Sequence, residues 1–169
     1  MTAIAAKNMI IQLMLDIDSV IVGSRFIEGG GYKGVKDISS TSFLQAVNNV
    51  RNSNDSVFGM IFSIMFNKFL RILLSLKIYD LTSGFIIGRK SYFNTECFKN
   101  VDYGEYFLYV INDLVKKEIN IKEIGYICET RKYGVSKTAN TFTQLIKRGI
   151  PYIKIAILCR IENNGNKRS

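Results

Sequence analysis

The chain has 169 residues, 47% of them hydrophobic, which suits a single domain with a sizeable core. Its formal net charge of +9 favours an acidic partner, such as a phosphorylated substrate, an anionic lipid surface or a nucleic acid. The chain has no histidine, which excludes histidine acid–base catalysis and histidine zinc ligands. Its three cysteines lie far apart and form no metal or disulfide pattern, so we expect a reducing compartment.

Targeting and membrane-spanning patterns are the next feature of the sequence. The first fifteen residues contain no signal-peptide pattern. The apolar run Ile150–Ile161 is too short to span a bilayer and is broken by Lys154 and Arg160. We therefore expect a cytoplasmic protein without a transmembrane span, peripheral on the membrane face.

The first half of the chain predicts two helices and a strand. Apolar residues at helical spacing predict an amphipathic helix over Ala3–Leu15. A short β-branched run predicts a buried strand over Ser19–Val22. Residues Glu28–Asp55 are polar and glycine-rich, which predicts a mobile loop. The segment Val57–Leu76 is apolar nearly all round and basic at its C-terminal end, so it predicts a helix that is either buried or interfacial.

The second half continues the alternation of helices and strands. We expect strands over Gly84–Gly88 and Ile119–Cys128, and helices over Tyr92–Lys99, Gly104–Lys117 and Thr141–Leu158. Gly149 and Pro151 predict an interruption of the last helix. Residues 161–169 are polar and predict a disordered tail, which leaves residues 1–160 as one α/β unit.

The polar stretch Asp80–Phe85 predicts a turn between a helix and a strand. Asp, Thr, Ser and Gly in a row favour a turn over a regular element. Gly84 permits a positive φ and lets a ligand approach the backbone. Hydroxyl and amide groups there would suit a polar or anionic ligand, and an ordinary connecting turn is the alternative.

Basic residues flank this turn in sequence on both sides. Arg25 follows the predicted strand, at the end where open α/β sheets bind ligands, and a guanidinium there binds phosphate well. A surface or ion-paired arginine is the alternative. The segment from Arg131 to Lys137 is a second basic cluster, which by composition alone is an exposed turn.

An Asp-x-Asp sequence at Asp16–Asp18 matches the metal-binding signature of many glycosyltransferases. We do not interpret it as a metal site. Asp18 directly precedes the predicted strand, so these carboxylates fit a helix exit and a strand start.

Four motifs in order carry a family resemblance. They are Gly23-Ser24-Arg25 with the glycines that follow, Asn67-x-x-x-Arg71, Asp80-Leu81-Thr82-Ser83-Gly84-Phe85, and Arg131-x-x-Gly134-x-Ser136-Lys137. Together they resemble the polyprenyl-phosphate (dolichol-phosphate) mannosyltransferases of glycosyltransferase family 2. The resemblance covers residues 10 to 145 and corresponds to the second half of that family's catalytic domain.

The resemblance implies a fold and an activity. The fold would be a partial glycosyltransferase-A type, a Rossmann-like mixed sheet flanked by helices and lacking the N-terminal nucleotide-binding strands. The activity would be transfer of a sugar, here mannose from GDP-mannose, to a polyprenyl (dolichyl) phosphate by a truncated or split enzyme. Transfer of glucose or another sugar, a non-catalytic membrane-surface module and an inactive fragment are the alternatives.

The resemblance also implies site residues. We predict catalytic roles for Arg25, Arg131 and Lys137, and substrate-binding roles for Ser24, Arg51, Asp80, Thr82, Ser83, Gly84 and Ser136. Arg51 is a substitute for a basic residue of the family's acceptor loop, whose aligned position is Gly59. Asp80 would either bind sugar hydroxyls or hold the turn.

The remaining partners follow from the same resemblance. The family's Mg²⁺ or Mn²⁺ would have its ligands outside this chain, in a separate N-terminal half. The acceptor phosphate is already an anion, so the reaction needs cations rather than a strong base. A membrane surface is expected as a partner and nucleic acid is not, because the aromatic residues lie in apolar runs rather than among lysines and arginines.

Overall fold

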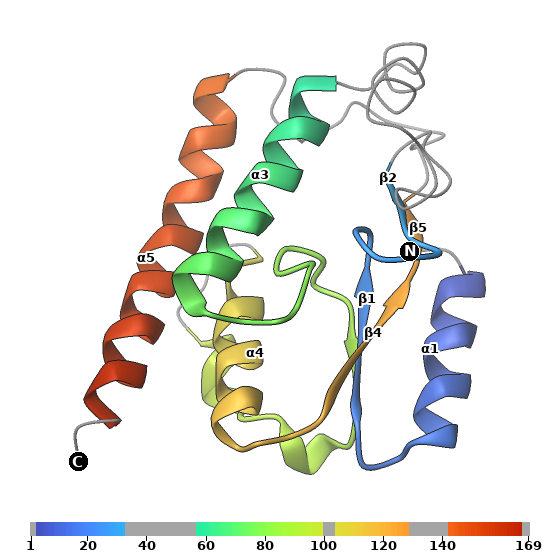
Figure 1. Cartoon of the computed structure of the whole chain (residues 1–169). Helices are drawn as coiled ribbons and strands as arrows, with labels where there is room; N and C mark the ends of the chain where they lie inside the picture. The colour runs from blue at the N-terminus through green and yellow to red at the C-terminus, as the bar shows by residue number, and fades with distance from the viewer. Residues whose placement is uncertain (1–2, 33–56, 100–103, 129–141, 167–169) are drawn as a thin grey trace.

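The computed structural model describes residues 3–32, 57–99, 104–128 and 142–166, which form a mixed α/β structure (Figure 1). The helices are α1 (Ala3–Leu15), α3 (Val57–Leu74), α4 (Tyr106–Lys116) and α5 (Phe142–Asn166). The strands are β1 (Val20–Ser24), β2 (Gly31–Tyr32), β3 (Ile86–Ile87), β4 (Ile121–Gly125) and β5 (Ile127–Cys128). The predicted α/β class is therefore confirmed.

The main sheet has the order β3-β1-β4, with β1 in the middle. β4 runs parallel to β1, with Val20 opposite Ile121 and Ser24 opposite Gly125. β3 runs antiparallel to β1 on its other side. The predicted mixed sheet is thus present, and its assignment to the glycosyltransferase-A type stays a prediction.

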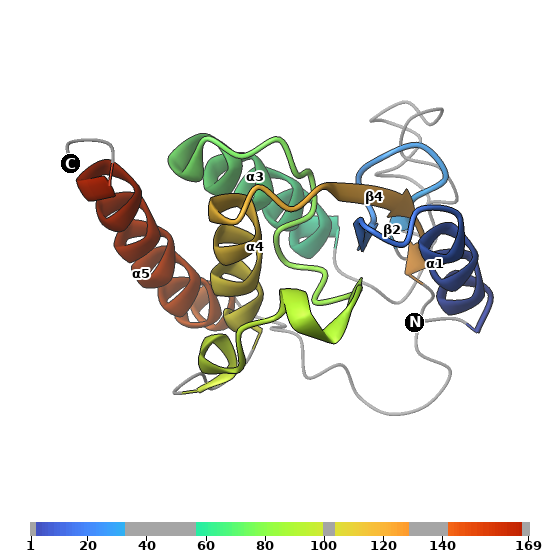
Figure 2. The same cartoon turned by 90° about the horizontal axis from the view of Figure 1, so that it is seen from below.

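Helices cover both faces of the sheet. α3, α4 and α5 lie on one side and α1 lies on the other, as the view from below shows (Figure 2). Strand alternation divides β1 between the two layers. Val20 and Val22 join the core clusters formed with α3, α4 and α5. Gly23 faces α1, where a Cβ atom would meet Met9 Sδ at 3.4 Å and Phe85 Cβ at 3.2 Å.

α5 is longer and more regular than its sequence predicts. It is continuous from Phe142 through Asn166 and contains Pro151, so the predicted interruption is wrong. The predicted disordered tail from residue 161 is wrong up to Asn166. Packing explains the continuity, because the buried side of α5 contributes to the same core cluster as α3 and α4. Tertiary burial of this kind offsets the hydrogen bond that a proline removes.

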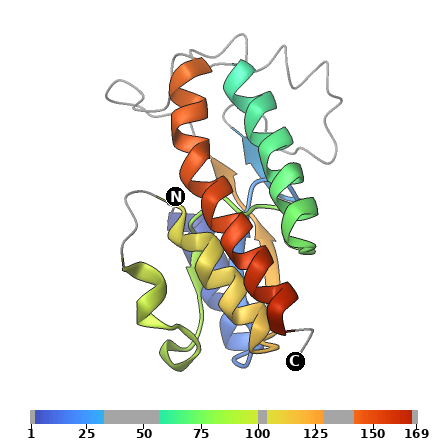
Figure 3. The same cartoon turned by 90° about the vertical axis from the view of Figure 1, so that its left-hand side faces the viewer.

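α3 and α5 lie side by side in both side views (Figures 1 and 3). Phe66 of α3 meets Tyr152 of α5 edge to face, with ring centroids 6.0 Å apart. A Cβ atom on Gly149 would lie 3.5 Å from the Phe66 ring. Gly149 therefore lies where α5 faces Phe66 of α3, and it does not break the helix.

Two other predicted elements are corrected. The helix expected over Tyr92–Lys99 is replaced by two 3₁₀ turns, and the side chain of Asn94 caps the second by accepting from the Glu96 amide at 3.0 Å. The strand expected over Ile119–Cys128 is divided in two at Tyr126. There the pairing changes strands, because β4 pairs with β1 whereas β5 pairs with β2, and the Tyr126 carbonyl accepts from the Gly31 amide at 3.0 Å.

The ends of two earlier segments also differ from expectation. α3 ends at Leu74 because Ser75 takes a left-handed backbone conformation (φ 55°). The predicted loop from Glu28 to Asp55 contains the short strand β2, and its residues from 33 onward lie outside the described ranges.

α1 has the predicted bounds but an unexpected orientation. Its buried residues are Ala5 and Met9. The large apolar residues that mark the helix in the sequence are exposed, namely Ile10, Ile11, Met14 and Leu15. The sheet therefore leaves most of the large apolar side chains of α1 exposed.

None of the helices in the described ranges combines the length and the apolar character that crossing a bilayer requires.

Candidate functional site

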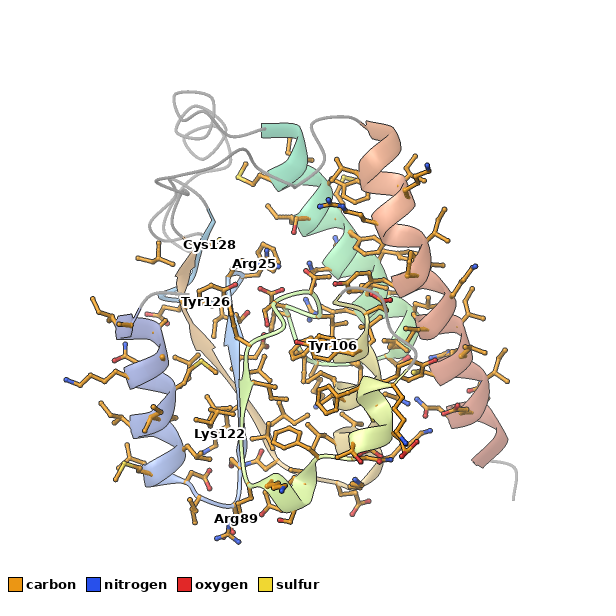
Figure 4. The ribbon with its side chains drawn as sticks, turned by 180° about the vertical axis from the view of Figure 1, so that it is seen from behind. Arg25, Arg89, Tyr106, Lys122, Tyr126 and Cys128 are labelled. Atoms are coloured by element: carbon orange, nitrogen blue, oxygen red, sulfur yellow. The ribbon has the colours of Figure 1, made fainter. Side chains whose placement is uncertain are left out.

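Three motifs that are distant in sequence meet at the carboxyl end of β1. Arg25 is the first residue after this strand, and Figure 4 shows it at the same end of the sheet as Tyr126 and Cys128. Its guanidinium binds the Asp80 carboxylate with two bonds, Nε to Oδ2 at 2.7 Å and Nη2 to Oδ1 at 2.8 Å. The backbone N–H of Arg25 also donates to Asp80 Oδ2 at 2.9 Å. The Asp80 side chain is fully buried and that of Arg25 is 13% exposed, so this is a buried bidentate ion pair.

Thr82 and Asn67 extend the ion pair into a network. Thr82 Oγ1 accepts from Arg25 Nη2 and from Asn67 Nδ2, both at 2.8 Å. Asn67 Oδ1 accepts from the Leu81 amide at 2.7 Å. The buried side-chain amide of Asn67 thereby links the turn to α3, which explains a buried asparagine in this largely apolar helix.

Gly84 closes the predicted turn with a left-handed backbone (φ +68°), which a residue with a Cβ atom rarely adopts. Within the turn, Asp80 Oδ1 accepts from the Thr82 amide at 3.3 Å and Ser83 Oγ accepts from the Phe85 amide at 3.3 Å. These are the local side-chain bonds that make such residues turn formers. The predicted turn at Asp80–Phe85 is confirmed.

Glu123 of β4 is a site residue that the sequence does not reveal. Its carboxylate accepts from the amides of Tyr79 at 2.8 Å and of Asp80 at 3.1 Å, and it also bonds the Ser24 hydroxyl. Burial raises the pKa of Glu123, and these donors offset part of that rise. In sequence, Glu123 resembles a solvent-facing residue of a half-buried strand, and only the meeting of β4 with the turn distinguishes it.

The glycines after Arg25 allow the chain to fold back over the sheet. Gly29 has a positive φ of 73°, and the Gly30 amide donates to Ile27 O at 2.8 Å to close a tight turn. A side chain on Gly125 would collide with the backbone of this turn. The turn therefore sits directly on the end of β4, beside Arg25, where only glycine fits.

Arg71, the last residue of the Asn-x-x-x-Arg motif, lies apart from this network. Its guanidinium carbon is 3.8 Å from the centroid of the Tyr79 ring, a cation–π contact. Its Nε is buried and has no hydrogen-bond partner in the part of the chain that is described. Arg71 thus orders the approach to the turn.

The predicted site residues fall into two groups. Arg25, Asp80, Thr82, Ser83 and Gly84 come together at the carboxyl end of β1. Ser24 is adjacent, but its hydroxyl is buried and accepts from the Phe26 amide at 3.4 Å. Arg51, Arg131, Ser136 and Lys137 lie outside the described residues.

The partners of Asp80 define its role. Its carboxylate accepts from the Arg25 side chain, the Arg25 amide and the Thr82 amide. It therefore holds the turn, which is the second of the two roles considered from the sequence. A phosphate that binds Arg25 would have to compete with this carboxylate for Nε and Nη2.

The Asp16-x-Asp18 carboxylates lie at the other end of β1, one strand length or about 16 Å away. Asp16 pairs with Lys122 at 2.6 Å, and Asp18 pairs with Arg89 at 3.1 Å. The hydrogen bond from Lys122 holds the pKa of Asp16 below its usual value. Across the described ranges, no three His, Cys, Asp or Glu side chains gather in a way that would hold a metal ion.

Comparisons of this chain with protein-family models, with curated proteins and with solved structures give no match. The family resemblance therefore rests on the sequence motifs alone.

Proposed function

We propose that the chain is the acceptor-side part of an enzyme that transfers a sugar from a nucleotide-diphosphate sugar to a polyprenyl phosphate. Mannose from GDP-mannose and dolichyl phosphate are the expected substrates, and another sugar such as glucose is the nearest variant. The donor-binding half would be supplied by a separate polypeptide or by a segment outside this sequence.

One observation carries the proposal: residues of three motifs are neighbours in space although they lie far apart in sequence. Arg25 and Asp80 are 55 positions apart and share a bidentate ion pair, and Asn67 joins them through Thr82. The carboxyl ends of parallel strands are also where α/β proteins commonly bind ligands.

The chemistry of the reaction suits the residue types. Two phosphorylated groups must be held together against their mutual repulsion, and charge builds on the leaving diphosphate. Cations and backbone N–H groups meet both demands without a general base. We assign these cationic roles to Arg131 and Lys137, and Arg25 orders the turn at Asp80–Phe85.

The open edge of the sheet supports a missing partner half. β3 is an edge strand of the described sheet, and a groove of about 200 Å³ lies between it and α1. Apolar side chains line the groove, among them Met9, Ile10 and Phe85. A further strand beside β3 would cover this groove and extend the sheet, as the donor-binding half of the enzyme requires.

Reconstitution tests the proposal. The chain would be co-expressed with the donor-binding half of a polyprenyl-phosphate mannosyltransferase and assayed for transfer of labelled mannose from GDP-mannose to dolichyl phosphate. We expect transfer only when both polypeptides are present, and its loss in Arg131→Ala without loss of folding. Unchanged turnover in Arg131→Ala would remove this residue from the site.

A binding experiment needs no second half. The chain alone should bind a short-chain polyprenyl phosphate saturably, seen as a shift of the ³¹P resonance, and Lys137→Ala should weaken it. Absence of any shift, together with failed reconstitution with each sugar nucleotide, would overturn the proposal.

A non-catalytic membrane-surface module is the second candidate function. It is favoured by the exposed apolar and basic residues of α3 and α5. It predicts vesicle binding that nucleotide sugars do not change.

A further inference from the structure

The Glu123 side chain holds two consecutive peptide groups immediately before the turn at Asp80–Phe85. Its Oε2 accepts from the Tyr79 amide at 2.8 Å, and its Oε1 accepts from the Asp80 amide at 3.1 Å. The same carboxylate bonds the hydroxyl of Ser24, a buried residue. Only a carboxylate side chain offers two acceptor oxygens, so these donors select an acidic residue at this position.

Asp80 transmits this contact to Arg25. The backbone N–H of Asp80 donates to Glu123, and the Asp80 carboxylate accepts from Nε and Nη2 of Arg25 at 2.7 and 2.8 Å. Asp80 is thus held at its main chain by β4 and at its side chain by the residue that follows β1. Because the ion pair is bidentate, the direction of the Asp80 side chain fixes that of the guanidinium. A shift of the backbone at Tyr79 and Asp80 would therefore move Arg25.

Glu123 and Asp80 bring two carboxylates together beside one guanidinium. Burial raises the pKa of Glu123, and the nearby charge of Asp80 adds to that rise. Arg25 is the cation that pairs with Asp80. Partly buried carboxylates whose pKa is shifted by burial and by a neighbouring charge are concentrated at functional sites. The arrangement is therefore one that a site, rather than an ordinary connecting turn, would retain.

Glu123 also lies on the strand that leads to the predicted cationic segment. It is opposite Val22 in the parallel pairing of β4 with β1. From β4 the chain continues into β5, which ends at Cys128, and Arg131 is three positions further along the sequence. Figure 4 shows Cys128 and Arg25 at the same end of the sheet. The Glu123 side chain thus links the turn to the strand from which the chain continues to Arg131.

We propose that Glu123 is a positioning residue of the sugar-transfer site. By holding the amides of Tyr79 and Asp80, it fixes the turn, and through Asp80 the Arg25 guanidinium, relative to β4. A misplacement of about 1 Å in such a site lowers a rate about a hundredfold, because the reacting groups must be held in line. The inference rests on the proposed function for its reaction, whereas the link from Glu123 to Arg25 rests on the hydrogen bonds of this chain alone.

The link to Arg25 is tested on the chain alone, by ¹⁵N NMR of the Arg25 Nε–H group. Glu123→Gln keeps the shape of the side chain but only one acceptor oxygen. We expect the Arg25 Nε–H to exchange with solvent about tenfold faster in this variant, as the loss of one buried hydrogen bond predicts. Glu123→Asp, which keeps both oxygens on a shorter stem, should change the exchange in the same direction. If Glu123→Gln does not fold, both readouts are taken from Glu123→Asp.

The role in the reaction is tested in the reconstituted enzyme by transfer of mannose from GDP-mannose. Glu123→Gln should lower kcat about a hundredfold and leave the KM for GDP-mannose unchanged, because the other half binds the donor. Circular dichroism gives the folded fraction, so kcat is expressed per folded molecule. A purely structural role would lower the folded fraction and leave this kcat as it is in the wild type.

The matched control is Asp16→Asn. This carboxylate also contacts β4, through Lys122 at 2.6 Å, but it lies at the amino end of β1. The substitution likewise replaces a carboxylate by an amide of the same shape. Both the exchange of the Arg25 Nε–H and kcat should be unchanged in this variant.

Two results would overturn the inference and leave the proposed function in place. One is an Arg25 Nε–H that exchanges as in the wild type in both Glu123 variants. The other is transfer by folded Glu123→Gln at the wild-type kcat. Absence of both sugar transfer and polyprenyl-phosphate binding in the wild type is a different result, because it overturns the proposed function and the positioning role with it, even where the Arg25 resonance responds to the variants.

Discussion

The two ends of β1 both carry ion pairs, but in opposite environments. At its carboxyl end, Arg25 and Asp80 form a buried bidentate pair that is joined to Thr82 and Asn67. At its amino end, Asp16 and Asp18 pair with Lys122 and Arg89, whose side chains are exposed. A buried pair leaves an uncompensated charge when one partner is removed, whereas an exposed partner returns to water. The same type of ion pair therefore holds buried residues together at the carboxyl end of β1, whereas at the amino end it lies on the surface.

The largest effect should come from breaking the buried pair. Asp80→Ala leaves the Arg25 guanidinium without its carboxylate, and we expect a loss of about 3 kcal/mol in the free energy of unfolding. Urea unfolding followed by circular dichroism measures it. Asp18→Ala at the other strand end is the control and should leave the unfolding midpoint where it is in the wild type. Equal effects of the two substitutions would show that the ends do not differ.

The next largest effect on stability should come from Asn67, whose side-chain amide links the turn to α3. Asn67→Ala removes the acceptor of the buried Leu81 N–H and should cost about 1–3 kcal/mol of unfolding free energy. Asn120→Ala is its counterpart at the amino end, where an exposed amide donates to Ser19 Oγ at 2.9 Å. We expect a clearly smaller loss of unfolding free energy in this control. A loss in Asn67→Ala no larger than in Asn120→Ala would contradict the proposed anchoring.

A smaller, pH-dependent effect should separate Glu123 from the surface carboxylates. Its folded-state pKa is raised, mainly by burial, so the folded protein binds a proton more tightly than the unfolded chain. The stability that Glu123 contributes is therefore present below its unfolded pKa and declines as the pH rises through its folded pKa. As the pH rises from 4 to 7, the free energy of unfolding of the wild type, measured with urea, should fall relative to that of Glu123→Gln, which has no carboxyl group to titrate. A difference in unfolding free energy that stays constant over this pH range would contradict the prediction.

The smallest effect on stability is expected at Asp16, whose contribution depends on pH in the opposite direction to that of Glu123. Lys122 holds the pKa of Asp16 below its usual value, so its contribution to stability is lost as the pH falls through that lowered pKa. Carboxyl carbon NMR should find Asp16 titrating below 3.8 and Glu123 above 4.5. Asp16→Asn should also leave the metal dependence of any reconstituted activity unchanged, and loss of that dependence would make the Asp-x-Asp a true metal site.

Several elements could be predicted from the sequence because their signals are local. The bounds of α1 follow from apolar spacing, and α3 ends two residues before its predicted end. The turn at Asp80–Phe85 follows from residues that bond their own backbone, and Gly84 adopts the positive φ that its position suggested.

Other features depend on contacts that no local pattern contains. Pro151 predicts a break, yet α5 continues through it because one side of the helix is buried against α3 and α4. The spacing of Ile10, Ile11 and Met14 predicts a helix, but not that they would be exposed while Ala5 and Met9 are buried. In both cases tertiary packing decides what local propensity leaves open.

By itself, then, the sequence determined the α/β class, the turn and the positive charge, since these depend on neighbouring residues and on composition. Only the tertiary structure decided that Arg25 binds Asp80, that Glu123 holds the amides before the turn, and which apolar side chains remain exposed. The physical reason is that such contacts join residues tens of positions apart, and their strength depends on burial, which exists only once the chain has folded.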